Sequence, residues 1–131
     1  MNLLIDTHVA IWAVDSDPKL PRVAKLLLAD PNNQLFVSAI SIWEISIKYA
    51  LRRQSADPIN ISGQQAITLF EKSGFSLLPI TAEHAAAVDH LPALHGDPFD
   101  RLLVAKAGHD EMHLVTHDPK LAAYGDFVIT V

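Results

Sequence analysis

The first fifteen residues, MNLLIDTHVAIWAVD (residues 1–15), place an apolar run, a carboxylate and a helical segment in direct succession. Leu3-Leu4-Ile5 is short, continuous and apolar, which is typical of a strand that is buried on both faces. The residues from about 8 to 15 then predict a helix. A strand that passes into a helix at Asp6 is the first unit of an α/β fold.

The rest of the chain repeats this alternation of short apolar runs and helical segments. Further strands are expected at residues 35–37, 75–80, 114–116 and 127–129. Helices are expected at 21–28, 41–53, 82–91 and 98–107, with one more ending near Ser73-Gly74 and a helical turn at 119–124. This order predicts a three-layer α/β/α fold with a central, mostly parallel sheet of about five short strands. No repeat or linker divides the sequence, so residues 1–131 are expected to form a single domain.

The composition excludes several classes of protein. Half of the residues are apolar and 19% are charged, which is typical of a globular protein. There is no cysteine, so disulfides, thiolate catalysis and cysteine-ligated zinc are ruled out. The seven histidines form no His-Glu-x-x-His motif. The first residues lack a basic segment, and no apolar run approaches the roughly 20 residues that span a bilayer. We therefore expect a cytoplasmic protein without a membrane partner.

The net charge of −5 comes from 15 acidic residues against 10 Lys and Arg. Proteins that bind nucleic acid by neutralising phosphates are usually basic. The acidic balance therefore counts against a simple DNA- or RNA-binding module. A nuclease remains compatible with this charge if metal ions and a local basic patch offset the acids.

Four acidic residues occupy comparable places, each where a strand ends or a helix begins. They are Asp6 after the first strand, Glu44 just after Ser41, Asp100 just after Pro98, and Asp118 after the fourth strand. Right-handed crossovers bring the ends of parallel strands and the starts of the following helices to one edge of the sheet, where ligands of α/β proteins bind. We therefore expect these four side chains to converge.

Each acid also has a local explanation that involves no chemistry. Ser41-Ile42-Trp43-Glu44 fits a capping box, Asp97-Pro98 and Asp118-Pro119 fit an N-cap followed by proline, and Asp6 fits a turn. Taken singly, these explanations are favoured. Taken as a set, several carboxylates at one edge would repel one another, and a divalent cation would offset that repulsion. Ligands that are all oxygen suit Mg²⁺ or Mn²⁺.

Four stretches of the chain resemble the PIN-domain nucleases, and more closely the VapC-type toxins of toxin–antitoxin pairs. They are LIDTH (residues 4–8), SAISIWEI (38–45), DPFDRLL (97–103) and LVTHD (114–118). Each stretch alone is weak, but all four occur in the family's order and spacing. The resemblance extends from Met1 to about Tyr124.

The resemblance implies a metal-dependent endoribonuclease that hydrolyses RNA phosphodiester bonds with Mg²⁺ or Mn²⁺. The acidic quartet that it implies, as metal ligands and catalytic residues, is Asp6, Glu44, Asp100 and Asp118. It further implies a type II toxin with a cognate antitoxin, a homodimer, and an RNA target for which tRNA is typical of the family.

Two further residues match positions next to this quartet. Asp97 precedes Asp100 by one helical turn. It is expected to be an N-cap, and its further role is at most to orient one of the four acids without binding the metal itself. Thr116 matches a family hydroxyl position that orients a carboxylate or a water. A plain β-branched strand residue explains Thr116 equally well.

Lys48 and Arg101 could contact RNA, and both could equally be solvated surface, with Glu44 and Lys48 forming an ordinary i,i+4 pair. Two other functions stay open. One is a catalytically silent PIN-like module that binds a protein partner, although Trp12, Trp43 and Ile47 are expected to lie in the core. The other is an α/β phosphatase with Asp6 as nucleophile, which is disfavoured because Asp6-Thr7-His8 lacks the usual Asp-x-Asp.

Overall fold

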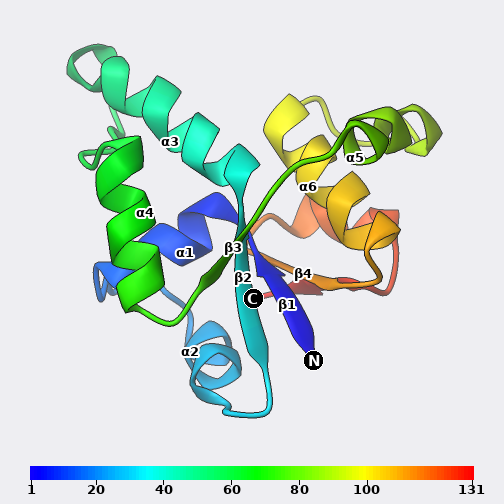
Figure 1. Cartoon of the computed structure of the whole chain (residues 1–131), viewed down its shortest axis with the longest axis horizontal. Coiled ribbons are helices and arrows are strands. Elements are labelled where there is room, and N and C mark those ends of the chain that lie inside the picture. The colour runs from blue at the N-terminus through cyan, green and yellow to red at the C-terminus, as the bar shows by residue number, and fades with distance from the viewer.

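The computed structural model describes residues 1–131, and a five-stranded sheet lies at its centre (Figure 1). The strand order is β3-β2-β1-β4-β5, and every neighbouring pair is parallel. The strands are β1 (Asn2–Ile5), β2 (Gln34–Ser38), β3 (Ser76–Leu78), β4 (His113–Thr116) and β5 (Val128–Thr130). The α-helices are α1 (Thr7–Val14), α2 (Arg22–Ala29), α3 (Ala39–Ala50), α4 (Gly63–Lys72), α5 (Ala82–Ala87) and α6 (Pro98–His109). Three 3₁₀ segments complete the chain: η1 (Arg52–Gln54), η2 (Val88–His90) and η3 (Pro119–Tyr124).

Two hydrophobic cores cover the two faces of this sheet, because successive side chains of a strand point to opposite faces. Leu3 and Ile5 belong to one core, which also holds buried side chains of α1, α2, α3 and α4. Leu4 belongs to the other core, together with side chains of α6 and η3. Figure 1 shows α1, α2 and α4 on one side of the sheet and α5 and α6 on the other. The predicted three-layer α/β/α fold is confirmed, and none of its helices has the length and apolar character needed to cross a membrane.

The start of α3 differs from the prediction. The helix begins at Ala39, and the hydroxyl of Ser38 caps it by accepting the N–H of Ile40 at 3.1 Å. The proposed capping box of Ser41 and Glu44 is therefore wrong, and Glu44 lies in the second turn of α3. Both Ser38 and Ser41 could cap a helix, but Ser38 ends β2 in an extended conformation, so the helix starts directly after it. The helix also ends earlier than expected, and Arg52–Gln54 forms η1.

Two other elements are shorter than predicted from the sequence. The strand expected at 75–80 is Ser76–Leu78, and the helix expected at 82–91 is α5 followed by η2. The prediction that Trp43 lies in the core is wrong, because this residue is 58% exposed. Its ring instead lies edge-on to Phe99 of α6, with ring centroids 5.4 Å apart.

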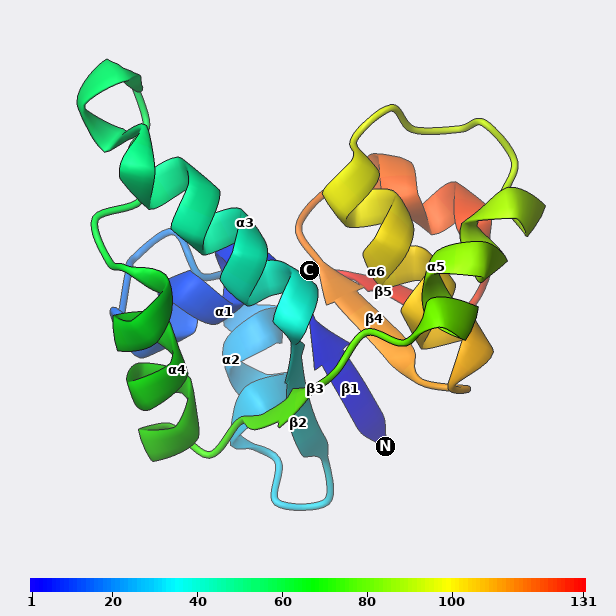
Figure 2. The ribbon, with the colours of Figure 1, turned by 45° about the horizontal axis from the view of Figure 1, so that its top comes forward.

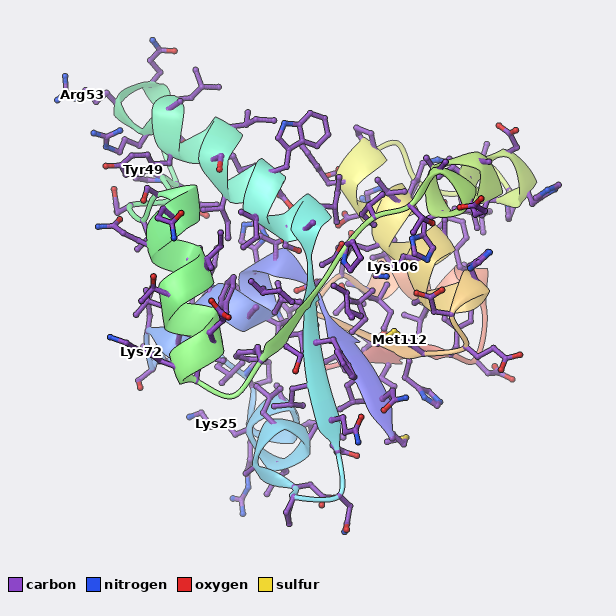
Figure 3. All side chains as sticks on the ribbon, in the orientation of Figure 1. Lys25, Tyr49, Arg53, Lys72, Lys106 and Met112 are labelled. Atoms are coloured by element: carbon purple, nitrogen blue, oxygen red, sulfur yellow. The ribbon has the colours of Figure 1, made fainter.

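The carboxylate of Asp110, at the C-terminal end of α6, links this helix to α5 through an ion pair and a hydrogen bond. Lys106 (Figure 3) is almost fully buried on α6, and its Nζ lies 2.9 Å from Oδ2 of Asp110. His84 of α5 bonds the other oxygen of Asp110 through Nε2, also at 2.9 Å. Partial burial acts to raise the pKa of Asp110, but the bonds from His84, His109 and Lys106 outweigh it and hold the pKa well below its ordinary value. One carboxylate thus satisfies two buried donors from two helices.

We predict that Asp110→Ala lowers the free energy of unfolding by about 2 kcal/mol, because it leaves the Lys106 ammonium and His84 Nε2 buried without their acceptor. Lys106→Met keeps the packing and leaves no buried charge, so it should cost less than Asp110→Ala. Urea unfolding of the two variants measures the difference. A Lys106→Met variant that is the less stable of the two would contradict this account of the pair.

Candidate active site

The carboxylate of Asp6 is held at both oxygens where β1 passes into α1. Oδ1 accepts the N–H of Val9 at 2.9 Å, which caps α1. Oδ2 accepts the hydroxyl of Thr116 at 2.5 Å, and Thr116 is the last residue of β4, the strand beside β1. Asp6 is 8% exposed. The turn expected at Asp6 is therefore a helix cap, and the cap uses only one of the two oxygens.

Glu44 approaches the same edge of the sheet from α3. Its Oε1 accepts the hydroxyl of Thr7, the residue after Asp6, at 2.8 Å. The Thr7 hydroxyl is also hydrogen-bonded to that of Ser41, one turn before Glu44, at 2.8 Å. Oε2 forms the i,i+4 ion pair with Lys48 at 2.5 Å. Glu44 is thus buried beside the start of α1 and keeps a cation next to it.

Asp100 and Asp118 meet around the imidazole of His95, which the sequence analysis did not single out. Asp118 accepts the N–H of Lys120 through Oδ1 at 3.0 Å, and its Oδ2 lies 2.8 Å from His95 Nε2. The same Nε2 is 3.7 Å from Oδ2 of Asp100. Asp97 caps α6 with bonds from Phe99 N–H at 2.8 Å and Asp100 N–H at 3.4 Å. The expected N-cap role of Asp97 is confirmed.

The charges at this edge interact strongly. Burial is the largest cause that raises the pKa of Asp100, and together with the negative charges of Asp97, Asp6 and Glu44 it brings the pKa to about 7. Burial also raises the pKa of Asp6, although the bonds from Thr116 and Val9 oppose that change. Partial burial acts to raise the pKa of Asp118 as well, but the bond from His95 and the N–H of Lys120 outweigh it and lower the pKa. The predicted acids therefore lie in one small region, where burial and repulsion together disfavour the charged form of Asp100.

Figure 2 shows α3 and α6 on either side of the edge where β1 and β4 end, and the four acids come from these elements and from the residue before η3. The two basic candidates lie differently. Lys48 lies beside the acids because it forms an ion pair with Glu44. Arg101 instead donates to the carbonyl of Pro92 at 3.0 Å and to the hydroxyl of Tyr124 at 3.1 Å. Arg53 lies in η1, the 3₁₀ segment after α3, and projects away from this edge (Figure 3).

Three residues at the site were missed by the sequence analysis: Thr7, Ser41 and His95. Thr7 directly follows Asp6, and its hydroxyl could have been suspected of serving a nearby acid. His95 lies two residues before Asp97, a spacing that lets its ring accept the Asp97 N–H. The absence of a His-Glu-x-x-His motif excludes one type of zinc site, but it carries no information on a histidine that donates to a carboxylate.

We predict that Asp100→Asn makes the metal-free protein relatively more stable as the pH rises. The aspartate ordinarily titrates near 3.8 but near 7 in the folded protein, so the folded state holds more protons between these values. In wild type, the contribution of Asp100 to the free energy of unfolding is therefore present at low pH and is lost as the pH rises through about 7. Asparagine has no such titration. Urea unfolding in EDTA should show the variant gaining about 1–2 kcal/mol over wild type between pH 5 and pH 8.

The matched control is Asp126→Asn, which removes an exposed carboxylate that precedes β5 at the opposite edge of the sheet. It should follow the wild-type pH curve. A stability difference between Asp100→Asn and wild type that stays constant from pH 5 to pH 8 would show that folding does not raise the pKa of Asp100.

Known proteins match nearly the whole chain. The PIN-domain family model matches residues 3–126. Ribonuclease VapC22 of Mycobacterium tuberculosis is 32% identical over 125 residues, which is 94% of this chain and 92% of the relative.

Two solved structures share the fold at lower identity. VapBC2 from Rickettsia felis, bound to a DNA fragment from its promoter, aligns with a TM-score of 0.68 and 20% identity over 100% of this chain and 98% of that chain. FitAcB from Neisseria gonorrhoeae aligns with a TM-score of 0.62 and 21% identity over 98% of this chain and 96% of that chain. The family match over residues 3–126 and the relative at 32% identity lead to one conclusion: this chain belongs to the PIN-domain family.

Proposed function

We propose that this protein is a metal-dependent endoribonuclease that hydrolyses RNA phosphodiester bonds. The observation that carries the proposal is the gathering of Asp6, Glu44 and Asp100 at one edge of the sheet, with Asp118 joined to Asp100 through His95. Membership of the PIN-domain family and a relative named as a ribonuclease support RNA as the substrate. We assign Asp6, Glu44, Asp100 and Asp118 as the acids that carry the activity.

The donor set at this edge fits Mg²⁺ or Mn²⁺. All four side chains offer carboxylate oxygens, which these ions prefer. Burial and then the charges of neighbouring acids raise the pKa of Asp100, and a divalent cation would favour its charged form again. When bound, the ion supplies positive charge that polarises the phosphoryl oxygens and favours attack by water. A serine or cysteine nucleophile is not needed for that reaction.

The surrounding residues orient these acids. Thr116 and the Val9 N–H hold Asp6, and Thr7 holds Glu44. Each bond leaves lone pairs of the carboxylate free, because an ionised carboxylate offers about four acceptor sites. We propose that Thr116 acts in this way, as a hydroxyl that orients a carboxylate, and that Asp97 supports Asp100 by capping α6.

Lys48 is the better candidate for RNA contact. It is partly exposed beside Glu44 and lines an open groove of about 410 Å³ with His8, Gln54 and neighbouring residues. A groove that holds Lys48, the partner of Glu44, suits an RNA phosphate, and Asp57 is the one carboxylate that lines it. Arg101 is less suited, because its guanidinium is engaged by Pro92 and Tyr124.

We further propose that the protein is the toxin of a type II toxin–antitoxin pair and binds a cognate antitoxin. The relative's name and the toxin–antitoxin complexes among the structural neighbours support this assignment. A homodimer, a tRNA target, a single nuclease domain over residues 1–131 and a cytoplasmic location stay predictions.

We predict that Asp6→Asn lowers RNA cleavage in Mn²⁺ at least about 100-fold, since it removes one charged ligand from the site. Asparagine can still cap α1 through its side-chain oxygen, so the fold should persist. Mapping RNA ends after brief exposure to wild type and variant measures the loss, and Asp126→Asn serves as the control. If cleavage persists undiminished in Asp6→Asn, Asp100→Asn and the double variant, the assignment of this site is wrong. Wild-type protein that cleaves no RNA would favour the silent protein-binding module.

We also predict that Mn²⁺ stabilises wild type but not Asp100→Asn. A ligand at 100 times its Kd stabilises the folded state by about 2.7 kcal/mol, or about 5–10 °C in Tm for a protein of this size. The variant should shift by less than about 2 °C under the same conditions, and isothermal titration should give it a correspondingly weaker affinity. Equal shifts in the two proteins would place the ion elsewhere.

A further inference from the structure

His95 occupies the position between Asp100 and Asp118 that the proposed function leaves unexplained. It lies in the segment 91–97 between η2 and α6, and its side chain is 14% exposed. Nε2 is 2.8 Å from Asp118 Oδ2 and 3.7 Å from Asp100 Oδ2. Nδ1, on the other side of the ring, is 3.0 Å from the backbone nitrogen of Asp97. Both ring nitrogens therefore have partners.

These partners determine which ring nitrogen carries the hydrogen. A peptide N–H can only donate, so Nδ1 must present its lone pair to Asp97. The hydrogen of the neutral ring then lies on Nε2, which donates to Asp118. In this tautomer Nε2 has no lone pair for a cation. His95 is therefore a donor to the acidic cluster, although its position among the carboxylates resembles that of a ligand.

The ring is held in place by the start of α6. Asp97 caps that helix through its carboxylate while its N–H holds the ring, so one residue orients both His95 and Asp100. The guanidinium of Arg101 anchors the same segment through the carbonyl of Pro92. Asp118 follows β4, and its other hydrogen bonds are to Thr116 and Lys120. The bond from His95 is therefore the one that connects Asp118 to the segment that begins α6.

We propose that His95 is a positioning residue, whose fixed Nε2–H holds the Asp118 carboxylate beside Asp100. This role rests on the proposed function, in which both acids bind the same ion or ions. Two carboxylates left next to each other would turn apart, because like charges repel. A donor between them keeps their oxygens close before the ion arrives. Hydrogen bonds to ligand carboxylates commonly contribute 10- to 100-fold to metal affinity or activity.

Two amide substitutions separate the two bonds of the ring. Asparagine reaches the position of Nδ1, so His95→Asn can still accept the Asp97 N–H but cannot reach Asp118. Glutamine reaches the position of Nε2, so His95→Gln can donate to Asp118 but loses the bond to Asp97. Neither amide titrates or takes part in proton transfer at ordinary pH, so any difference between them reports hydrogen-bond position.

We predict that His95→Asn weakens Mn²⁺ binding about 10- to 100-fold and RNA cleavage by a similar factor. His95→Gln should stay within about threefold of wild type in both measurements, with an unchanged pH profile of cleavage. Isothermal titration with Mn²⁺ alone gives the first readout, and it does not depend on activity. The ¹⁵N shifts of the His95 ring in metal-free protein give a second, and should identify Nε2 as the protonated nitrogen. Urea unfolding checks that both variants fold.

Each other outcome overturns the proposal in a distinct way. Equal, large losses of Mn²⁺ affinity and cleavage in both variants would assign His95 as a metal ligand or a proton donor. A greater loss in His95→Gln than in His95→Asn would show that His95 only stabilises the segment 91–97 through its bond to Asp97. Wild-type behaviour of His95→Asn would remove any role. Wild-type protein that binds no Mn²⁺ would overturn the proposed function and this role together, whereas the first three outcomes leave the proposed function intact.

Discussion

Repulsion among carboxylates at one edge of a parallel sheet is the constraint on which the rest of the site depends. The topology brings the end of β1 and the starts of α3 and α6 together, and each of these elements contributes an acid. Asp100 is the acid most affected, because burial and then the charges of its neighbours raise its pKa to about 7. A fold that keeps such an edge needs donors to hold each carboxylate in place.

Three of the acids each have a donor from an element other than their own. Thr116 of β4 holds Asp6, Thr7 of α1 holds Glu44, and His95 holds Asp118 from the segment before α6. Capping and orientation do not compete at Asp6 and Asp118, because the cap takes one oxygen and the neighbour takes the other. The local explanation is thus correct for these two acids, and it leaves one oxygen of each carboxylate for another contact, so a capping motif in a sequence does not exclude a site.

Prediction from the sequence succeeded where the signal was local and periodic. The run Leu3-Leu4-Ile5 predicted a strand buried on both faces, and its side chains do divide between the two cores. It failed where two local signals were equivalent, as with Ser38 and Ser41, since only the end of β2 decides which serine caps α3. The burial of Trp43 was also mispredicted, because helical spacing alone does not say which neighbours cover a given face.

The sequence by itself determined the order of strands and helices, and with it the edge of the sheet at which the four acids gather. Hydrophobic runs, caps and prolines act over a few residues, so they can be read without knowing the fold. The tertiary structure alone decided the contacts that orient these acids: Thr116 reaches Asp6 across 110 residues of sequence, and His95 reaches Asp118 across 23. Such pairs form because β1 lies beside β4 in the sheet and the start of α6 lies above them, and no local pattern records that placement.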